Sequence, residues 1–173
     1  MKLSIKNIIF SIISIIALIF IDQFTKYLAV INLKDRSPFV IIKDVFELHY
    51  LENTGAAFGI LSGQKIILVI VTAIIIILLA LLYFKLPTDK RYTPLRIIEI
   101  FLFAGAIGNM IDRVLYNYVI DFFYFKLINF PIFNVADCYV TVAVFVLFIL
   151  VMFYYKDKDF DLIFPSKKKE AGQ

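Results

Sequence analysis

Four apolar segments, each close to the length needed to cross a lipid bilayer, constrain what this chain can fold into. They lie at about 8–31, 66–84, 95–115 and 138–155. A helix rises about 1.5 Å per residue and the hydrocarbon core is about 30 Å thick, so roughly 20 apolar residues complete one crossing. Strands with open edges would leave backbone groups unsatisfied in hydrocarbon. We therefore predict an all-α membrane protein with four transmembrane helices.

The composition agrees with a membrane protein and argues against a soluble enzyme. Hydrophobic residues make up 62% of the 173 residues, against about 45–50% in soluble domains. The net charge of +4 needs no nucleic-acid partner, because lysines on cytoplasmic loops explain it. The single cysteine, Cys138, and the single histidine, His49, exclude an internal disulfide and a zinc site of the His/Cys type. We expect no metal and no cofactor.

The distribution of lysine and arginine predicts how the helices are oriented. Cytoplasmic loops of membrane proteins carry an excess of both residues. Here basic residues precede the first segment, crowd the second connection and fill the tail at 156–173: Lys2, Lys6, Lys85, Lys90, Arg91, Arg96, Lys156, Lys158 and Lys167 to Lys169. We expect both termini in the cytoplasm and the loops 32–65 and 116–137 to be extracytoplasmic. The whole chain, 1–173, then forms one multi-pass domain, which we expect to be a monomer.

The first extracytoplasmic loop carries a strand pattern. Phe46, Leu48 and Tyr50 alternate with Glu47 and His49, and a period of two is typical of a strand with one covered face. We expect this loop to form a small β-sheet that lies as an arm at the membrane surface.

Polar residues inside and beside the predicted spans gather at one depth. An ionisable group in a span costs about 2.5 to 3.5 kcal/mol on insertion scales, so it persists mainly where it is paired or functional. The alternating helix directions bring one set of polar residues to the extracytoplasmic boundary: Asp22, Lys26, Asn109, Asp112, Arg113, Asp121, Asn134 and Asp137. Glu99 lies instead near the cytoplasmic face, where we expect it to snorkel toward water or to pair with Arg96.

Helical spacing indicates which of these groups can meet. Asp22 and Lys26 are four residues apart with the acid on the N-terminal side, which is the favourable order. Asn109, Asp112 and Arg113 are three and four residues apart and share one helix face. Buried ion pairs and amide hydrogen bonds hold helices together in membranes. We therefore expect Asp22 and Lys26 to brace the walls of a site.

Asp121 and Asp137 have no adjacent basic residue that would neutralise them. Two carboxylates close together in a poorly hydrated site share one proton, because both cannot be ionised. An aspartyl protease needs this state: the ionised acid takes a proton from the attacking water, and the neutral acid protonates the peptide carbonyl. The residue types alone leave two alternatives open, which are the proton-relay acids of a small proton-coupled transporter and ordinary helix caps.

Five sequence blocks resemble, in order and spacing, the signature of bacterial lipoprotein signal peptidase, also called signal peptidase II. They lie at 22–26 (DQFTK), 53–59 (NTGAAFG), 105–113 (GAIGNMIDR), 119–122 (VIDF) and 133–137 (FNVAD). The blocks span most of the chain. One departure is visible, because the family usually begins the third block with two glycines and Ala104 stands in place of the first.

The resemblance implies an intramembrane aspartyl endopeptidase of the bacterial inner membrane. Such an enzyme removes the signal peptide from a prolipoprotein by cleaving just before a cysteine that carries diacylglyceryl. The implied partners are lipidated prolipoproteins and membrane lipids. The lipid anchor would hold the scissile bond at the depth where the polar residues collect.

The resemblance also implies a role for each polar residue. Asp121 and Asp137 would be the catalytic pair. The residues implied to orient the substrate or the acids are Asn53, Gly55, Asn109, Arg113 and Asn134. The residues implied to support the pocket are Asp22, Lys26, Gly108 and Asp112.

Overall fold

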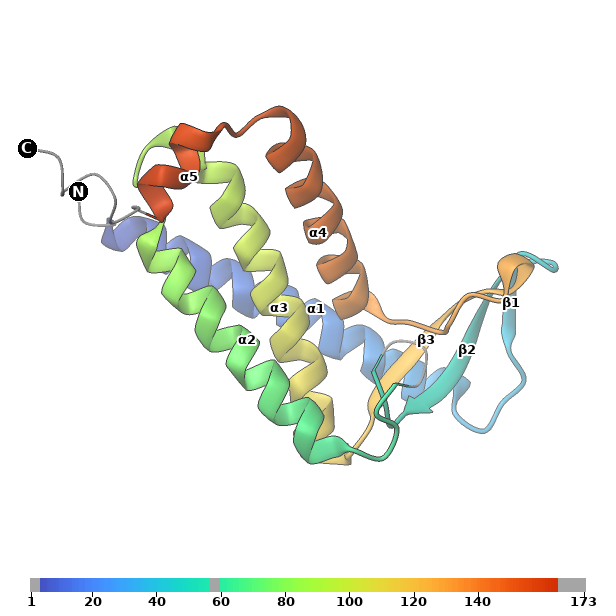
Figure 1. Ribbon diagram of the computed structural model, residues 1–173. Helices are drawn as coiled ribbons and strands as arrows, with labels where there is room; N and C mark the ends of the chain where they lie inside the picture. Colours follow the sequence, from blue (N-terminus) through green and yellow to red (C-terminus); the bar gives the residue numbers. More distant parts are fainter. Residues whose placement is uncertain (1–3, 57–59, 165–173) are drawn as a thin grey trace, which may run out of the picture.

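The computed structural model describes residues 4–56 and 60–164 (Figure 1). Within these residues four helices are long and apolar enough to cross a membrane. They are α1 (Ile5–Leu33), α2 (Lys65–Lys85), α3 (Thr93–Tyr116, preceded by the short helix η2 at Lys90–Tyr92) and α4 (Val135–Phe153). The predicted fold class is confirmed. Lys2, Lys167 to Lys169 and positions 57–59 of the second sequence block lie outside the described residues.

The start of α4 is set by a capping box. The backbone N–H of Asp137 donates to Asn134 Oδ1 at 3.0 Å, and the backbone N–H of Asn134 donates to Asp137 Oδ2 at 3.1 Å. These two bonds satisfy amide groups that a helix N-terminus otherwise leaves unpaired. The helix therefore begins at Val135 rather than near 138, and the Asp137 side chain is fixed to its first turn.

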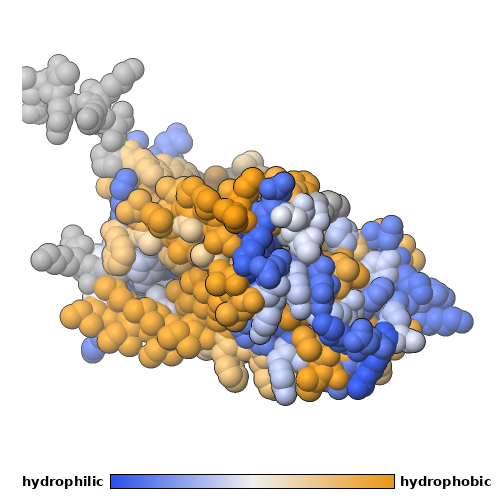
Figure 2. Space-filling model, turned by 90° about the horizontal axis from the view of Figure 1, so that it is seen from below, coloured by the Kyte–Doolittle hydropathy of each residue, from blue (hydrophilic) through white to orange (hydrophobic). Residues whose placement is uncertain are grey.

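The central helix of the bundle is α3, which contacts α1, α2 and α4. In its most apolar stretch 44% of the residues are buried, against 11% in each of the other three helices. Gly105 allows the close contact with α4, because a Cβ at this position would lie 2.6 Å from the backbone oxygen of Ala136. The outer helices expose large apolar side chains, and Figure 2 shows these hydrophobic areas, with hydrophilic residues gathered toward the sheet.

The sheet forms an arm at one end of the bundle, which is called the arm end below (Figure 1). Its antiparallel strands lie in the order β1 (Phe39–Ile42), β2 (Phe46–Asn53) and β3 (Val119–Phe125). The strand predicted at 46–50 is confirmed as part of β2. Ile120 and Phe122 of β3 pack against Ala29 and Leu33 of α1, and this apolar contact attaches the arm to the bundle.

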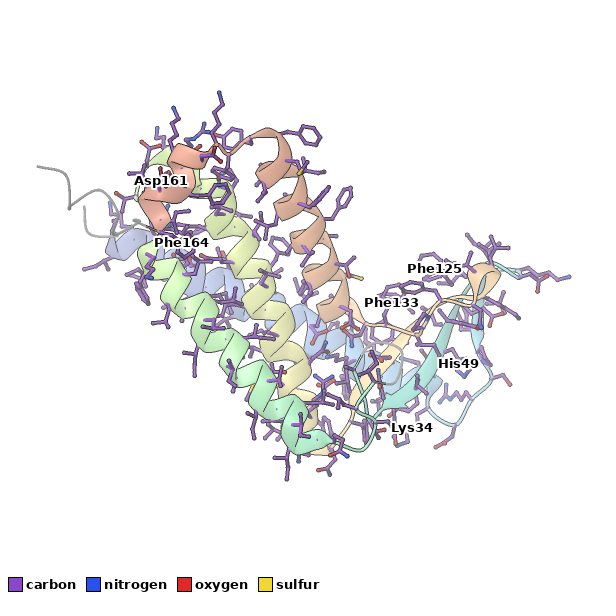
Figure 3. All side chains as sticks on the ribbon, in the orientation of Figure 1. Lys34, His49, Phe125, Phe133, Asp161 and Phe164 are labelled. Atoms are coloured by element: carbon purple, nitrogen blue, oxygen red, sulfur yellow. The ribbon has the colours of Figure 1, made fainter. Side chains whose placement is uncertain are left out.

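The two sides of the arm differ in character (Figure 3). Phe125 and Phe133 stack with ring centres 5.8 Å apart and lie on the side nearer α4. His49 and Lys34 lie on the opposite side. The aromatic side faces the cavity that is described below, because both phenylalanines line it.

The other end of the bundle is closed by a short helix, α5 (Asp157–Ile163), within the segment that was expected to be a tail. Arg91 holds this helix, because its Nε and Nη2 each donate at 2.7 Å to one carboxylate oxygen of Asp159. Tyr92 and Tyr155 pack beneath it. The loop between α2 and α3 is thereby tied to the C-terminal segment.

The expectation for Glu99 is wrong. Its side chain is 3% exposed, and both carboxylate oxygens lack a hydrogen-bond partner within the described residues. Arg96 does not pair with it, because Arg96 Nη2 donates to the backbone oxygens of Leu86 and Pro87 at 3.0 and 2.6 Å. The guanidinium of Arg96 thus binds backbone carbonyl groups at the end of α2 and forms no ion pair with Glu99.

Candidate active site

Asp121 and Asp137 reach the same cavity from different elements. Asp121 lies in β3 and Asp137 in the first turn of α4, and both line a cavity of about 810 Å³. Asn134 joins them, because its Nδ2 donates to Asp121 Oδ1 at 2.6 Å and its backbone N–H donates to Asp137 Oδ2 at 3.1 Å. The fold therefore brings together two acids that are separated along the chain.

The two remaining carboxylate oxygens also accept hydrogen bonds from asparagine side chains. Asn53 Nδ2 donates to Asp121 Oδ2 at 2.8 Å, and Asn109 Nδ2 donates to Asp137 Oδ1 at 2.8 Å. All four oxygens of the pair thus have an N–H donor. Each of the three asparagines that the sequence singles out contacts at least one of the two acids, and Asn134 contacts both.

The two acids differ in their surroundings. Asp121 is 1% exposed, and burial, together with the nearby charge of Asp137, raises the pKa of Asp121 to about 7. Asp137 lies in the first turn of α4, where the helix dipole and the N–H of Asn134 stabilise a negative charge. Near neutral pH this arrangement favours a proton on Asp121.

A buried ion cluster lies behind the pair and ties α1 to α3. Lys26 Nζ lies 2.9 Å from Asp22 Oδ2 and 2.9 Å from Asp112 Oδ2, and none of the three side chains is more than 1% exposed. A buried charge needs such partners, because removing it from water is costly. The spacing of Asp22 and Lys26 therefore predicted a real ion pair.

The ion cluster also holds the backbone next to each catalytic candidate. Asp22 Oδ1 accepts a hydrogen bond of 2.9 Å from the N–H of Ala136, which precedes Asp137. Asp112 Oδ2 accepts one of 3.1 Å from the N–H of Ile120, which precedes Asp121. The positions of β3 and α4 relative to each other are thus set through α1 and α3.

Gln23 belongs to the same cluster, although the sequence reasoning did not single it out. Its Nε2 donates to Asp112 Oδ1 at 2.9 Å, to Asp22 Oδ2 at 3.1 Å and to the backbone oxygen of Gly108 at 3.2 Å. The sequence feature that could have identified Gln23 is an amide side chain next to an acid inside an apolar span. Gly108 leaves room for this arrangement, because a Cβ there would lie 2.6 Å from Asp22 Oδ2.

Arg113 lines the cavity and holds the segment that follows β2. Its Nη2 donates to the backbone oxygen of Gly55 at 3.0 Å, and the N–H of Gly55 donates to Asn53 Oδ1 at 2.9 Å. Arg113 Nε is buried and has no hydrogen-bond partner within the described residues. An unpaired buried donor is costly, and a peptide carbonyl in the cavity would satisfy it.

The rest of the cavity wall is largely apolar. Among the residues that line it are Leu51, Val119, Phe125, Ile128, Phe130 and Phe133. A few convergent polar groups in an apolar cavity are typical of a ligand site, and this one suits a peptide that carries large apolar groups. Across residues 4–56 and 60–164 no cluster of three or more His, Cys, Asp or Glu side chains is placed to hold a metal ion.

Comparisons with known proteins agree with one another. The family profile described as "Signal peptidase (SPase) II" matches residues 14–153. A lipoprotein signal peptidase of Caldanaerobacter subterraneus subsp. tengcongensis is 40% identical over 144 residues, which cover 83% of this chain and 96% of the relative. One of Clostridioides difficile is 42% identical over 143 residues, which cover 83% and 95%. A solved structure, described as a bacterial membrane enzyme determined by the in meso method at 2.3 Å resolution, has a TM-score of 0.74 and 34% identity, over 87% of this chain and 90% of that one.

Proposed function

The chain belongs to the signal peptidase II family, and from that premise we propose that Asp121 and Asp137 are its catalytic pair. The protein is an aspartic endopeptidase that removes signal peptides from prolipoproteins. The observation that carries the proposal is a single cavity that both carboxylates line and where Asn134 joins them. The alternative of a proton-coupled transporter has no support in this family.

The two acids divide the steps of peptide hydrolysis. Asp137, ionised at the start of α4, takes a proton from water as the water oxygen attacks the scissile carbonyl carbon, and Asp121 gives its proton to the carbonyl oxygen. Asp137 then passes its proton to the leaving nitrogen, the C–N bond breaks, and one hydroxyl proton of the tetrahedral intermediate returns to Asp121. One water is consumed, and both acids end in their starting states.

The surrounding residues hold the acids and the substrate. Asn53, Asn109 and Asn134 keep the carboxylates in place through their amide N–H groups. Arg113 offers its unpaired Nε–H to a carbonyl of the substrate backbone, and its bond to Gly55 keeps the segment after β2 beside the cavity. Positioning of this kind contributes to the rate because the reacting groups need not search for one another.

The substrate is a precursor whose cysteine carries diacylglyceryl, and the cut falls just before that cysteine. The apolar wall that includes Phe125 and Phe133 accommodates the lipid and the apolar part of the signal peptide. An anchored lipid keeps the scissile bond at the boundary of the bilayer, and the polar residues of the site lie at that same depth.

The arm end lies outside the cytoplasm, and both termini lie inside it, at the inner membrane of a bacterium. The excess of lysine and arginine in the termini and in the α2–α3 connection supports this orientation. Residues 1–173 act as one domain and as a monomer among the membrane lipids, without a nucleic-acid partner.

The test is cleavage of a diacylglyceryl-modified precursor peptide by the purified protein, with the unlipidated peptide as the matched control. We expect only the lipidated peptide to be cut. Asp121→Asn and Asp137→Asn should each abolish cleavage while the protein keeps the unfolding temperature and elution volume of a folded membrane protein. Full activity in either variant would rule out the proposed pair.

A further inference from the structure

Lys26 uses all three of its N–H groups inside the protein. Its Nζ lies 2.9 Å from Asp22 Oδ2, from Asp112 Oδ2 and from Asn109 Oδ1, and the side chain is 1% exposed. The two carboxylates already neutralise the ammonium group. The third contact is made to a neutral amide, and that amide contacts Asp137.

This third contact decides which way the amide of Asn109 is turned. An ammonium group can only donate hydrogen bonds, so Asn109 Oδ1 must face Lys26. Asn134 Nδ2 donates to the same oxygen at 3.1 Å. Asn109 Nδ2 is then turned to Asp137 Oδ1, at 2.8 Å. If the amide were rotated by 180°, its oxygen would face a carboxylate and its N–H groups would face an ammonium, and both contacts would be repulsive.

We propose that Lys26 is a positioning residue for Asp137: through Asn109 it presents the N–H donor that fixes the Asp137 carboxylate and directs it into the cavity. The inference rests on the proposed catalytic pair. Asp137 must hold a carboxylate oxygen toward the attacking water, and the bond from Asn109 Nδ2 fixes where that carboxylate lies. Besides its ion pair with Asp22, Lys26 therefore positions Asp137 through Asn109.

The charge of Lys26 has a second effect that a structural role would not produce. The groups that face Asp137 are Asp121 from β3, Arg113 from α3 and Cys138 from its own helix. The positive charge of Lys26 lowers the pKa of Asp121 against the larger effect of burial. Removing this charge should therefore move the pH profile of cleavage to higher pH.

Position 26 also borders a second cavity. It has a volume of about 200 Å³, and Lys26, Lys34, Tyr27 and Tyr116 are among its lining residues. Tyr27 and Tyr116 are 59% and 47% exposed, so this cavity opens to the surface. None of its lining residues lines the 810 Å³ cavity. In Lys26→Ala the space left by the side chain would adjoin this cavity, so we expect a small amine to reach position 26 without entering the space for the peptide.

The experiment compares Lys26→Ala with the unchanged protein and with Lys34→Ala, using the lipidated precursor. We expect Lys26→Ala to lower kcat about 10- to 100-fold, which is the effect of losing one hydrogen bond to a charged group, with little change in KM and with a profile moved to higher pH. Propylammonium in the buffer should restore part of the rate, and 1-propanol should not. Lys34→Ala, which lines the second cavity only, should retain full activity.

Lys26→Ala leaves two buried carboxylates without their partner, so the variant is also tested by its unfolding temperature in detergent. Should it fail to fold, Lys26→Met combined with Asp112→Asn removes one charge of each sign, and the same fall in kcat is expected. A folded variant with full kcat and an unchanged pH profile would overturn the inference. So would a loss that only follows the folded fraction and does not respond to propylammonium.

Asp137→Asn is assayed in parallel to separate the two proposals. Activity retained in Asp137→Asn would remove the catalytic pair itself. An inactive Asp137→Asn beside a fully active Lys26→Ala would leave the pair in place and remove only the role of Lys26.

Discussion

Asp22 of α1 accepts a hydrogen bond of 2.9 Å from the backbone N–H of Ala136, the residue that precedes Asp137 in α4. The two residues are 114 positions apart along the chain. Asp22 also binds Lys26 at 2.9 Å. One carboxylate therefore connects the charge cluster of the first helix with the backbone of the fourth helix, next to a proposed catalytic acid.

Replacing Asp22 should destabilise the protein and impair catalysis together. Asp22→Ala removes a partner of Lys26 and leaves the N–H of Ala136 unsatisfied, and breaking a buried ion pair costs about 3 to 5 kcal/mol. We expect a clear fall of the unfolding temperature in detergent and a lower kcat in the folded fraction. Asp44→Asn is the control, because Asp44 is exposed, and it should change neither quantity. Equal unfolding temperatures in the two variants would contradict this reading.

Gln23 offers a test in which the sign of the charge matters. Gln23→Ala removes hydrogen bonds to Asp112 and to Gly108, and a bond to a charged partner contributes about 1.5 to 3 kcal/mol. Gln23→Glu should be more harmful than Gln23→Ala, because it places a third carboxylate against Asp22 and Asp112. Asn32→Ala, which removes an exposed amide of the same helix, should be close to neutral. The unfolding temperature should be highest in Asn32→Ala, lower in Gln23→Ala and lowest in Gln23→Glu, and any other order would contradict the prediction.

The pH dependence of kcat should show that cleavage requires Asp121 to be protonated. Because burial raises the pKa of Asp121 to about 7, and because the mechanism needs this acid protonated, kcat should fall as the pH rises through about 7. Asn53 donates to Asp121 Oδ2 and so favours its charged form. Asn53→Ala should raise the pKa further and move the alkaline limb of the kcat profile to higher pH. A limb that moves to lower pH would speak against Asp121 as the acid.

The contact between Arg91 and Asp159 should stabilise the end opposite the arm without affecting catalysis. The guanidinium of Arg91 lowers the pKa of the Asp159 carboxyl below its usual range. This contribution to stability is fully present above the ordinary value near 3.8, declines as the pH falls below it, and is lost as the pH passes through the lower pKa of the folded protein. Arg91→Ala should lower the unfolding temperature at neutral pH, with a smaller effect at pH 3. The kcat of the folded protein should remain unchanged, and a fall in kcat would show that α5 influences the site.

The sequence predicted the four helices because long apolar segments permit few other structures in lipid. It also predicted the ion pair of Asp22 and Lys26, since helical spacing alone brings these side chains together. The strand at 46–50 followed from its alternating pattern. Each of these features involves residues that are close together along the chain, so the local sequence pattern is enough to predict it.

Contacts between distant elements were harder to predict. The amide of Gln23 meets Asp112 only because α1 crosses α3 at Gly108, and no local pattern encodes that crossing. The predicted pair of Glu99 and Arg96 does not form, because Arg96 binds backbone carbonyl groups at the end of α2. The helix α5 depends on Arg91, which lies 68 positions from Asp159. Each of these features is decided by tertiary packing.

The polar contacts of the site all lie at the arm end, whereas α2 between its terminal lysines, and α4 beyond Asp137, contain no charged residue. In the proposed orientation, every proton that the proposed reaction moves therefore travels between neighbouring groups on one side of the bilayer. No charge crosses the electric field of the membrane during turnover. Cleavage should consequently proceed at the same rate in energised and in de-energised cells.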